Sequence, residues 1–312
     1  MGKLERLEIW WQDEGVIGIA KALWVAAIYL TPCYGVCERV LGDELHEQCV
    51  RAPRLGYWPT ISEPQTFNEK LLHRKLHTDD PLFSVVSDKW EARRYVEECL
   101  GPGILNEVYH HTSDAQTIPF DDLPERYVVK ANHGCGWNIF VENNGAADRE
   151  QIRSECERWL NRTYGGRKRE YWYEDIEPTI LVERYIESDR SSVPRDYKFF
   201  VFDGRVEYIE VDFDRFSDHT RRFFDREWSP QEFRLEFPLG PIADPPPDLE
   251  EMIHVAETLG EPFDAIRVDL YNPRPGSVVF GEITVAHGAG GEKFIPDEVD
   301  HEFGAYWPMD GA

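Results

Sequence analysis

The chain has 312 residues, enough to bury a large core and to form two or three lobes. Hydrophobic residues make up 41% and charged residues 30%, which is typical of globular proteins and excludes a largely disordered chain. The formal net charge of −25 repels nucleic acid over long range, so we expect no nucleic-acid partner. The six cysteines show no CxxC pair and no zinc-like spacing, which indicates reduced thiols in a cytoplasmic protein.

Residues 1–60 predict a helical N-terminal extension. Its apolar segment 16–30 is shorter than the roughly 20 residues of a membrane-spanning helix, and Lys21 interrupts it. Asp13 and Glu14 precede the segment and no small-residue cleavage site follows, which argues against a signal peptide. The segment is therefore either a buried or dimer-forming helix, or a helix in a membrane interface that makes the protein peripheral at the inner face of the membrane.

Residues 61–125 predict a mainly helical lobe. The leucines of 67–76 share one face of a helix, and Asp88 is expected to cap a second helix over 89–100. The Gly-Pro-Gly run at 101–103 ends that helix.

Residues 126–187 predict a small lobe with a glycine loop. A strand, the loop and a second strand are expected over 127–141, followed by a helix over 148–164 and a buried strand over 180–186. Asp148 is the expected N-cap of the helix.

Residues 188–312 predict a larger lobe dominated by strands. Strands over 197–202 and 205–212 flank Asp203-Gly204, a strong signal for a two-residue hairpin turn. The polar, arginine- and proline-rich stretch 213–247 predicts a long loop region, and a helix is expected over 249–259.

The last predicted element is a hairpin that carries two carboxylates. Strands over 265–272 and 277–285 alternate apolar and polar residues, and a turn at 275–276 places Asp269 opposite Glu282. The same register pairs Tyr271 with Phe280 and Arg267 with Thr284.

Carboxylates directly opposite each other on neighbouring strands lie roughly 5 Å apart at Cβ and destabilise a sheet unless they are neutralised. Mg²⁺ would neutralise them, because it typically takes one or two carboxylates and completes its shell with phosphates and water. The alternative is a solvent-exposed pair with Arg267 as its counterion.

The glycine loop lies in YVVKANHGCGWNIFVE, residues 127–142. A Walker-type loop places its lysine after the glycines and continues into a helix, whereas here Lys130 precedes them and a strand follows. The loop is therefore not a P-loop. We interpret Cys135 within it as a small residue that fills a turn rather than as a nucleophile.

Seven motifs resemble, in sequence order, those of the TupA-like ATP-grasp family, which is named for a teichuronopeptide biosynthesis protein. They are FNEKLLHRKL, SDKWEARRYV, YVVKANHGCGWN, ILVERYIE, DYKFFVFDG, VDFDRFSDHTR and IRVDLYN…FGEIT, and they cover roughly residues 63 to 305. The resemblance implies an α+β ATP-grasp fold in which two α+β lobes clamp ATP.

The resemblance also implies which residues bind the phosphates of ATP. Lys89 and Lys130 would meet the α- and β-phosphates, and Lys198 would reach the phosphates from the next sheet. The glycine loop would close over the phosphates through backbone N–H groups. Its residues with this role are His133, Gly134, Gly136 and Asn138.

At the nucleoside end, the resemblance implies that Glu183 accepts a hydrogen bond from the adenine amino group. The backbone of Arg184, Tyr185 and Ile186 would read the adenine edge, and Glu187 would bind the ribose.

For the metal, the resemblance implies that Asp269 and Glu282 hold Mg²⁺. Thr284 stands where many ATP-grasp ligases have Asn, and its hydroxyl would ligate the metal or order a metal-bound water. Arg267 would stabilise the acyl phosphate and the tetrahedral species, with Arg221 and Lys198 as further catalytic groups.

The acceptor is expected beneath residues 211–221. Arg215 and Arg221 would clamp a carboxylate bidentately, whereas Asp212 or Asp214 would hold an ammonium group or a sugar hydroxyl.

Several of these residues also have a purely structural interpretation. Lys130 would be an edge-strand lysine, Glu183 a surface residue, and Lys198 the partner of Asp196 in a salt bridge. The loop HGCGWN at 133–138 would be a plain hairpin connection.

The predicted function is ATP-dependent ligation of a carboxylate to an amine, with small-molecule substrates such as an amino acid and a sugar unit of a cell-envelope polymer. One alternative reads Asp212-x-Asp214 as the metal motif of a glycosyltransferase that uses sugar nucleotides. Another is an ATP-binding module without catalytic activity.

Overall fold

The computed structural model describes residues 16–18, 20–21, 23–25, 27, 34–187, 195–214 and 218–309. It divides into two compact units. The first comprises the residues up to 78 together with 233–236 and those from 288 onward, and the second comprises 79–232 and 237–287. Both units are assembled from separated stretches of chain, whereas the sequence analysis predicts four consecutive segments.

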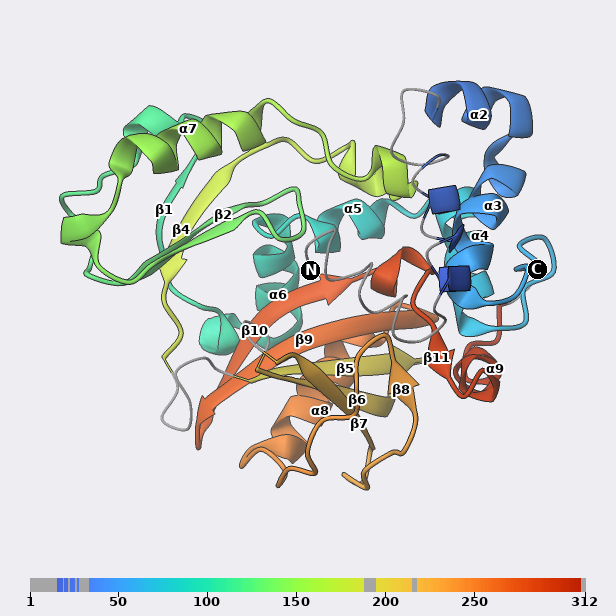
Figure 1. The fold of residues 1–312 in the computed structure, drawn as a ribbon. Coiled ribbons are helices and arrows are strands. Elements are labelled where there is room, and N and C mark those ends of the chain that lie inside the picture. The colour runs from blue at the N-terminus through green and yellow to red at the C-terminus, as the bar shows by residue number, and fades with distance from the viewer. Residues whose placement is uncertain are drawn as a thin grey trace. The chain divides into compact units, whose positions relative to one another are not determined.

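The first unit is mainly helical (Figure 1). Thr66 caps α4 in a capping box with Glu69, so this helix begins at Phe67 as the sequence predicts. Its elements are α2 (Tyr34–Leu41), α3 (Asp43–Leu55), α4 (Phe67–His77), β8 (Arg234–Leu235), β11 (Phe294–Ile295) and α9 (Glu298–Ala305).

A buried ion cluster joins α3 to α4 in this unit. The ammonium group of Lys75 lies 2.9 Å from the carboxylate of Glu47, and both side chains are fully buried. Arg51 donates to the same carboxylate at 3.1 Å. The N-terminal region from residue 43 onward is therefore part of the core of the unit and not only an appendage.

Segment 16–30 lies partly outside the described residues, since 19, 22, 26 and 28–30 are not among them. Its expected role in dimerisation or membrane contact stays a prediction. Within the described part of the chain, no helix combines the length and apolarity needed to cross a membrane.

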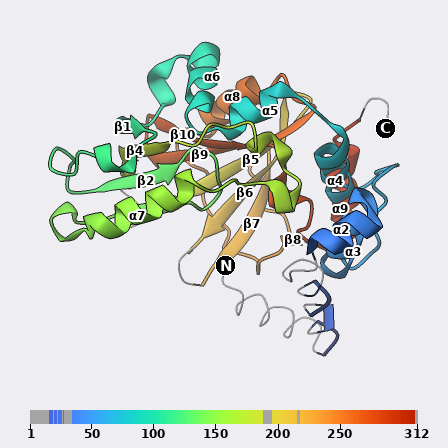
Figure 2. The same cartoon turned by 90° about the horizontal axis from the view of Figure 1, so that it is seen from above.

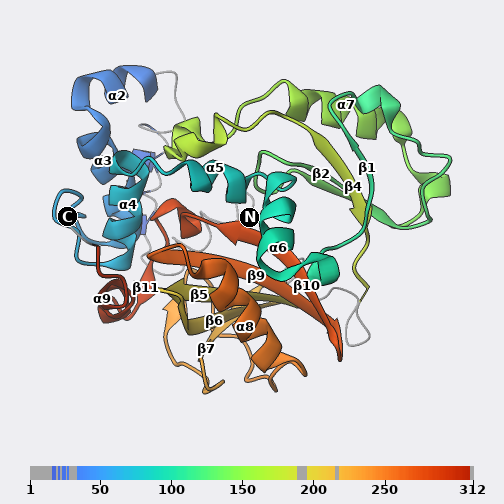
Figure 3. The ribbon, with the colours of Figure 1, turned by 180° about the vertical axis from the view of Figure 1, so that it is seen from behind.

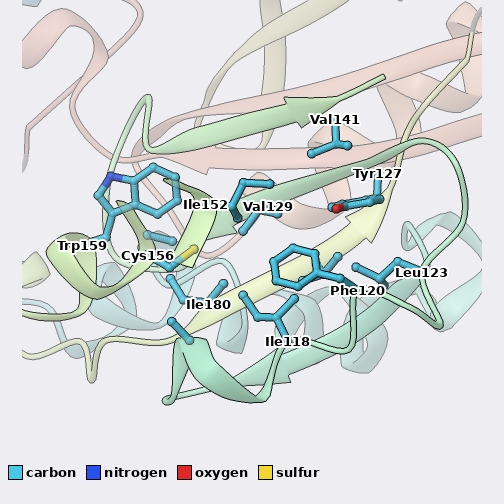
Figure 4. Close-up of a cluster of buried hydrophobic side chains, with 13 residues drawn as sticks. Ile118, Phe120, Leu123, Tyr127, Val129, Val141, Ile152, Cys156, Trp159 and Ile180 are labelled. Atoms are coloured by element: carbon cyan, nitrogen blue, oxygen red, sulfur yellow. The ribbon is translucent and has the colours of Figure 1, made fainter. Parts of the chain in front are cut away.

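The second unit contains an antiparallel four-stranded sheet with the order β1–β4–β2–β3. Helix α7 lies along the sheet, and its Ile152, Cys156 and Trp159 pack into a core with sheet residues (Figures 2 and 4). The elements are β1 (Val108–Thr112), β2 (Tyr127–Ala131), β3 (Asn138–Val141), β4 (Ile180–Arg184) and α7 (Arg149–Leu160).

Asp148 is the N-cap of α7, as predicted, because its side chain accepts from the backbone N–H of Gln151 at 3.0 Å. The helix ends at Leu160 rather than at 164. The sequence does not predict strand β1, because its residues show no alternation of apolar and polar positions. In the structure all five are half-buried.

Two helices, α5 (Pro81–Ser87) and α6 (Glu91–Leu100), precede β1. Asp88 accepts from the backbone N–H of Trp90 at 2.8 Å, so its side chain does serve the start of α6. The helix nevertheless begins two residues later than expected, which leaves Lys89 in the turn before it.

A five-stranded antiparallel sheet with the order β10–β9–β5–β6–β7 forms the other half of the second unit. Asp203 and Gly204 both have positive φ angles, 46° and 72°, which is the geometry of the predicted two-residue turn. The elements are β5 (Asp196–Phe202), β6 (Arg205–Phe213), β7 (Thr220–Asp225), β9 (Ala265–Arg274), β10 (Ser277–Thr284) and α8 (Leu249–Gly260).

The prediction of a long loop over 213–247 is wrong at β7 and at β8. Strand β7 carries two arginines, which gave it the polar composition of a loop. In the sheet, however, both Arg221 and Arg222 are buried, and Arg221 lies opposite Asp212 of β6.

The predicted register of the carboxylate hairpin is confirmed where it matters for the site. Asp269 lies opposite Glu282, and Arg267 lies opposite Thr284. The predicted pair of Tyr271 with Phe280 is wrong, because a register shift between Ser277 and Val279 places Tyr271 opposite Val279 instead. A second irregularity, between Phe280 and Glu282, restores the predicted register. Gly281 lies at this irregularity, and a Cβ there would come within 2.9 Å of the carbonyl oxygen of Asp269.

Helix α8 covers one face of this sheet (Figure 3). Buried apolar residues such as Phe199, Val201 and Val268 alternate along β5 and β9 with the polar residues of the other face. At the end of α8, a Cβ on Gly260 would lie only 2.6 Å from a methyl group of Val201, so the helix approaches the sheet closely because it carries glycine there.

We expect Gly260→Ala to lower the free energy of unfolding by about 1–3 kcal/mol, because Val201 is buried and β-branched and has little room to move. Chemical denaturation measures this difference. Gly103→Ala is the control, because a Cβ at Gly103 meets no atom within 4 Å. Equal stability of the two variants would contradict the close packing of α8 on β5.

Candidate active site

A cavity of about 480 Å³ in the second unit is lined by residues from both of its sheets. The four-stranded sheet and its glycine loop provide one wall, and β5, β9 and β10 provide the other. Residues predicted for the site that line the cavity are Lys89, Lys130, Gly134, Gly136, Asn138, Glu183, Arg184, Tyr185, Ile186, Asp269 and Glu282.

The base of the glycine loop is fastened by two side chains. Asn132 donates to Asp88 at 3.0 Å and to the carbonyl of Glu177 at 2.9 Å, and it accepts from the backbone N–H of Thr179. The ring of His133 lies 3.1 Å from the carbonyls of Trp159 and Arg162 at the end of α7. Burial lowers the pKa of His133. The side chain of His133 thus anchors the loop. The predicted phosphate contact of this residue involves only its backbone N–H group.

The two glycines of the loop are required for different reasons. A Cβ on Gly134 would lie 2.7 Å from the ring of Trp137, whereas Gly136 has a φ of +74° that favours glycine. Trp137 also contacts His133 edge-on at a centroid distance of 5.2 Å. The loop connects β2 to β3 as a hairpin, so the structural interpretation and a ligand-binding role are compatible here.

Lys89 reaches the loop from the turn before α6. Its ammonium group donates to the carbonyl of Gly134 at 2.6 Å, and its backbone N–H donates to the carbonyl of Asn132. A carbonyl neutralises no charge, so the positive charge of Lys89 stays available to an anion in the cavity.

Lys130 and Glu183 form an ion pair in the wall of the cavity, with 2.8 Å between the ammonium nitrogen and a carboxylate oxygen. Strand β2 lies between β4 and β3, so the interpretation of Lys130 as an edge-strand lysine is wrong. Glu183 is buried, so its interpretation as a surface residue is also wrong. Burial raises the pKa of Glu183, but Lys130 and Arg93 outweigh burial and hold that pKa below its usual range.

The end of β4 provides the segment expected to read adenine. Arg184, Tyr185 and Ile186 line the cavity, whereas Glu187 does not and instead pairs with Arg126 at 2.9 Å. Asn106, which the sequence analysis missed, also lines the cavity and donates to the carbonyl of Arg184 at 2.9 Å.

The face of the five-stranded sheet opposite α8 carries rows of ionisable residues. Residues that lie opposite one another on β10, β9, β5 and β6 form one row: Glu282, Asp269, Lys198 and Glu210. A second row on β5, β6 and β7 consists of Asp196, Asp212 and Arg221. Register therefore brings together residues that are far apart in the sequence.

Lys198 is buried among carboxylates of this face. Its ammonium group lies 2.5 Å from Asp196 and 3.0 Å from Asp212. Burial lowers the pKa of Lys198, but the charges of Asp196 and Asp212 outweigh burial and raise it above its usual range. The salt bridge expected from the structural interpretation is present, and Lys198 does not line the cavity.

Arg267 is the counterion of the carboxylate hairpin. It donates to both oxygens of Asp269 at 2.6 and 2.7 Å and lies 3.5 Å from Glu282. The ring of His287, which the sequence analysis missed, contacts the same guanidinium group. Asp269 is buried, so the interpretation of a solvent-exposed pair is wrong, although Arg267 does have the counterion role.

Asp212 and Arg221 hold each other, with 2.8 Å between guanidinium and carboxylate. His219 lies 3.0 Å from Asp212, and Arg221 also contacts Glu210 at 3.0 Å. Burial raises the pKa of Asp212, but Arg221 and Lys198 outweigh burial and lower it. Asp214 lies at the exposed end of β6, and Arg215 falls outside the described residues.

This face carries more negative than positive charge. Burial and the neighbouring Asp196 raise the pKa of Asp269 to about 7, although Arg267 and Lys198 act against them. Five carboxylates, Asp196, Glu210, Asp212, Asp269 and Glu282, face three cations, Lys198, Arg221 and Arg267.

Asp269 and Glu282 could hold a divalent cation, because they lie opposite each other on neighbouring strands and the surrounding face has an excess of negative charge. Among the residues that the structure describes, no three Asp, Glu, His or Cys side chains converge on one point. The two carboxylates would therefore supply part of a Mg²⁺ shell, and phosphates and water would supply the rest. Thr284 is half-buried opposite Arg267 and does not line the cavity.

The apolar walls of the cavity were missed by the sequence analysis. Phe140 of β3, Tyr271 of β9 and Phe280 of β10 contribute aromatic rings to the lining, and Trp137 does so from the loop. A mostly apolar lining with a few convergent charged groups is typical of small-molecule sites. Aromatic residues on strands gave no signal, because they are equally typical of a core.

We expect Lys130→Gln to destabilise the protein more at neutral than at acidic pH. Without Lys130, burial is opposed by Arg93 and Asn106, and we expect burial to raise the folded-state pKa of Glu183 above that of the variant's unfolded state. The variant then loses stability as pH rises through about 4, the ordinary pKa of a carboxyl group, toward neutrality. In the wild type the folded-state pKa is lowered, so the contribution of Glu183 is present at neutral pH and disappears only on acidification.

Denaturation of wild type and Lys130→Gln between about pH 4 and pH 7 measures this difference. Lys89→Gln is the matched control, because Lys89 bonds to a carbonyl and leaves no buried carboxylate behind. A difference between wild type and Lys130→Gln that does not change with pH would contradict the ion pair.

The solved structures that are similar to this chain include three enzymes. D-alanine–D-alanine ligase from Bacillus anthracis in complex with ATP is 15% identical, with 66% of this chain and 57% of that chain covered and a TM-score of 0.40. The ADP complex of N5-carboxyaminoimidazole ribonucleotide synthetase is 11% identical, with coverage of 70% and 50% and a TM-score of 0.43. D-cycloserine synthetase is 15% identical, with coverage of 72% and 70% and a TM-score of 0.41. This chain thus spans little more than half of the first protein and half of the second.

No curated protein matches the chain. The sequence profile of the family described as TupA-like ATPgrasp matches residues 69–307. This match confirms the family resemblance of the seven motifs and, with the helices and antiparallel sheets described above, the α+β ATP-grasp fold class. Because the match extends over most of its length, the chain belongs to the TupA-like ATP-grasp family.

Proposed function

We propose that this protein is an ATP-dependent ligase that joins a carboxylate to an amine and releases ADP and phosphate. One observation carries the proposal. A single cavity is lined by Lys89, which bonds to a carbonyl, by a glycine loop and by two opposed carboxylates. These are the groups that phosphoryl transfer from a nucleotide to an acid requires.

In this proposal the adenine lies at the end of β4. Glu183 would accept from the adenine amino group, and the backbone of Tyr185 and Ile186 would meet the ring edge. Asn106 already occupies the carbonyl of Arg184, so it would orient this segment. The aromatic rings of Phe140 and Phe280 provide apolar surface in the same cavity.

The phosphates would then extend toward Lys89 and the glycine loop. Lys89 donates to a carbonyl of the loop and so would bind a phosphate and hold the loop near it at once. Lys130 would exchange part of its contact with Glu183 for a phosphate oxygen. Asp269 and Glu282 would hold Mg²⁺, which supplies positive charge to the phosphates when it is bound.

The reaction would proceed in two displacements. An oxygen of the acceptor carboxylate attacks the terminal phosphorus, the bond to the ADP oxygen breaks, and ADP leaves. The amine then attacks the acyl carbon of the acyl phosphate, loses a proton, and phosphate leaves. The chain would contribute mainly positioning and charge, with Arg267 as the cation nearest to the hairpin carboxylates.

The acceptor substrate would bind near β6 and β7, the region expected from the sequence. Asp212 and Arg221 are bound to each other, so they would shape this region as a pair. Asp214, which follows β6, and Arg215, which falls outside the described residues, remain candidate contacts. By analogy with the biosynthesis protein for which the family is named, we propose an amino acid and a uronic acid or amino sugar as substrates, joined in the cytoplasm where ATP is present.

The glycosyltransferase alternative gains no support from the geometry. Asp212 is bound to Lys198 and Arg221, and neither it nor Asp214 lines the cavity, whereas Asp269 and Glu282 do. That alternative also assigns no role to Lys89 or to the hairpin carboxylates.

The proposed function is tested by screening pairs of carboxylates and amines for ADP release in the presence of Mg²⁺ and ATP. The panel contains amino acids, uronic acids and amino sugars, and the products are identified by mass. We expect ADP release with an amide product for at least one pair. Sugar transfer from a sugar nucleotide without ATP would contradict the proposal, and ATP binding without ADP release for any pair would favour a module without catalytic activity.

We expect Glu282→Gln to lower ADP release by roughly a hundredfold or more, the scale on which loss of one charge-stabilising group reduces turnover. Glutamine preserves the shape of Glu282 but removes the negative charge that would hold Mg²⁺. The measurement is the rate of ADP release at saturating Mg²⁺ for the most active substrate pair.

The matched control for this variant is Glu207→Gln, which removes a carboxylate of β6 that pairs with Arg205 and does not line the cavity. It should leave the rate unchanged. A Glu282→Gln variant with the activity of the control would remove Glu282 from the metal site.

A further inference from the structure

Lys168 is a cation that the proposed function does not use. Three other lysines of this acidic chain, Lys75, Lys130 and Lys198, contact carboxylates. Among the described residues, Lys168 contacts no carboxylate within 4.0 Å. Its ammonium group instead donates to the phenol oxygen of Tyr164 at 2.6 Å and lies 5.0 Å from the centroid of that ring. Its positive charge is therefore not neutralised by a fixed partner.

The backbone around Lys168 forms a tight turn between α7 and β4. Lys168 and Glu170 both donate their backbone N–H to the carbonyl of Gly165, at 2.7 and 3.2 Å. Gly165 has a φ of +92°, and a Cβ there would lie 2.3 Å from the carbonyl oxygen of Glu170. Only glycine fits this position, so the turn holds the start of the Lys168 side chain in one place.

Aromatic contacts connect this turn to the glycine loop. The ring of Tyr164 meets the ring of Trp137 edge-on at a centroid distance of 5.6 Å, and it meets Tyr173 at 4.8 Å. Trp137 in turn packs against Gly134 of the loop. The rings of Tyr164 and Trp137 thus connect Lys168 to the glycine loop.

The electrostatic environment of Cys135, at the tip of the loop, shows which charges lie near it. Desolvation and then the charge of Glu282 raise the pKa of the Cys135 thiol, whereas Lys168 and Lys89 act to lower it. Lys168, Lys89 and Glu282 therefore all act on the same loop tip, which lines the cavity. This is the end of the cavity that the proposed orientation gives to the phosphates.

We propose that Lys168 binds the terminal phosphoryl group of ATP. The inference rests on the proposed function, because it requires the nucleotide to lie with adenine at β4 and its phosphates at the glycine loop. Lys168 does not itself line the cavity, so its flexible four-carbon side chain would swing from Tyr164 to the loop tip. ADP lacks the group that Lys168 would bind, so this lysine would make the protein prefer ATP to ADP.

The competing explanation is that Lys168 only holds Tyr164 in place. Tyr164→Phe separates the two, because it keeps the ring on Trp137 and removes only the phenol oxygen that accepts from Lys168. If the lysine served only the ring, Tyr164→Phe and Lys168→Gln would have the same effect on nucleotide binding.

The experiment measures the dissociation constants of ATP and of ADP by calorimetry, each with Mg²⁺ and without acceptor substrates. We expect Lys168→Gln to weaken ATP binding by about tenfold or more, the usual effect of losing a charge-assisted hydrogen bond, and ADP binding by less than about twofold. Lys168→Arg should retain most of the preference. The charge-matched control is Arg162→Gln, because Arg162 lies over the same Trp137 ring at 5.2 Å and should leave both constants unchanged.

Equal weakening of ATP and ADP by Lys168→Gln, or no weakening of either, would overturn the inference, as would an equal effect of Tyr164→Phe. Thermal unfolding of each variant confirms that the fold is retained. If the wild-type protein binds neither nucleotide, the proposed function fails as a whole. If the wild type binds both and Lys168→Gln leaves their ratio unchanged, only the role of Lys168 fails.

Discussion

The constraint on which the second unit depends is the charged face of the five-stranded sheet. Charged residues that are buried side by side cost several kcal/mol each unless partners of opposite charge are within contact distance. Alternation along β5 and β9 supplies some of those partners, since Lys198 meets Asp196 and Arg267 meets Asp269 two residues away on the same strand. The register of β5, β6 and β7 supplies Asp212 as a partner of Lys198 and Arg221. The partners do not balance, because five carboxylates face three cations. The excess lies next to the cavity, where Asp269 and Glu282 are opposed.

The two faces of this sheet differ in composition, and in the proposed function one would serve stability and the other chemistry. The face under α8 is apolar and closely packed, to the extent that α8 ends in glycine where it touches Val201. The other face cannot be apolar if it is to hold ions, and its charges are kept in fixed positions by one another. A rigid arrangement of this kind requires little reorganisation when a charged ligand arrives, which is the property that electrostatic stabilisation of a reaction needs.

Much of the site could be predicted from the sequence because its signals are local. The alternation along 265–272 and the turn at 275–276 predict Asp269 opposite Glu282, and this pair is kept because the two register shifts of β10 cancel. The Asp203-Gly204 turn fixed the neighbouring hairpin. The irregularity at Gly281 could not be predicted, since an extra residue in one strand leaves no trace in the alternation. Strand β7 was missed because its arginines have the composition of a loop. Only their partners make their burial favourable: carboxylates of β6 for Arg221, and Glu232 with two backbone carbonyls for Arg222.

The sequence indicated which residues belong to the site better than it indicated the residues with which they form ion pairs and hydrogen bonds. Nothing local in the sequence indicates that Lys130 pairs with Glu183 or that His133 points toward α7, because each partner is more than 20 residues away along the chain. The same holds for Asn106, whose role depends on the pairing of its neighbour β1 with β4.

The fastening of the glycine loop limits how far its tip can travel. Asn132 and His133 are bonded to three different parts of the unit, and Asn138 returns the chain to the sheet opposite Lys130. Residues 134–137 connect these fixed points, and the carbonyls of Gly134 and Trp137 are bonded to Lys89 and to the backbone of Ala131. Four residues span at most roughly 14 Å even when fully extended. In the proposed function, so short a loop would reach a nucleotide tail but would not uncover the whole cavity, so larger ligands would enter and leave past other parts of the cavity wall.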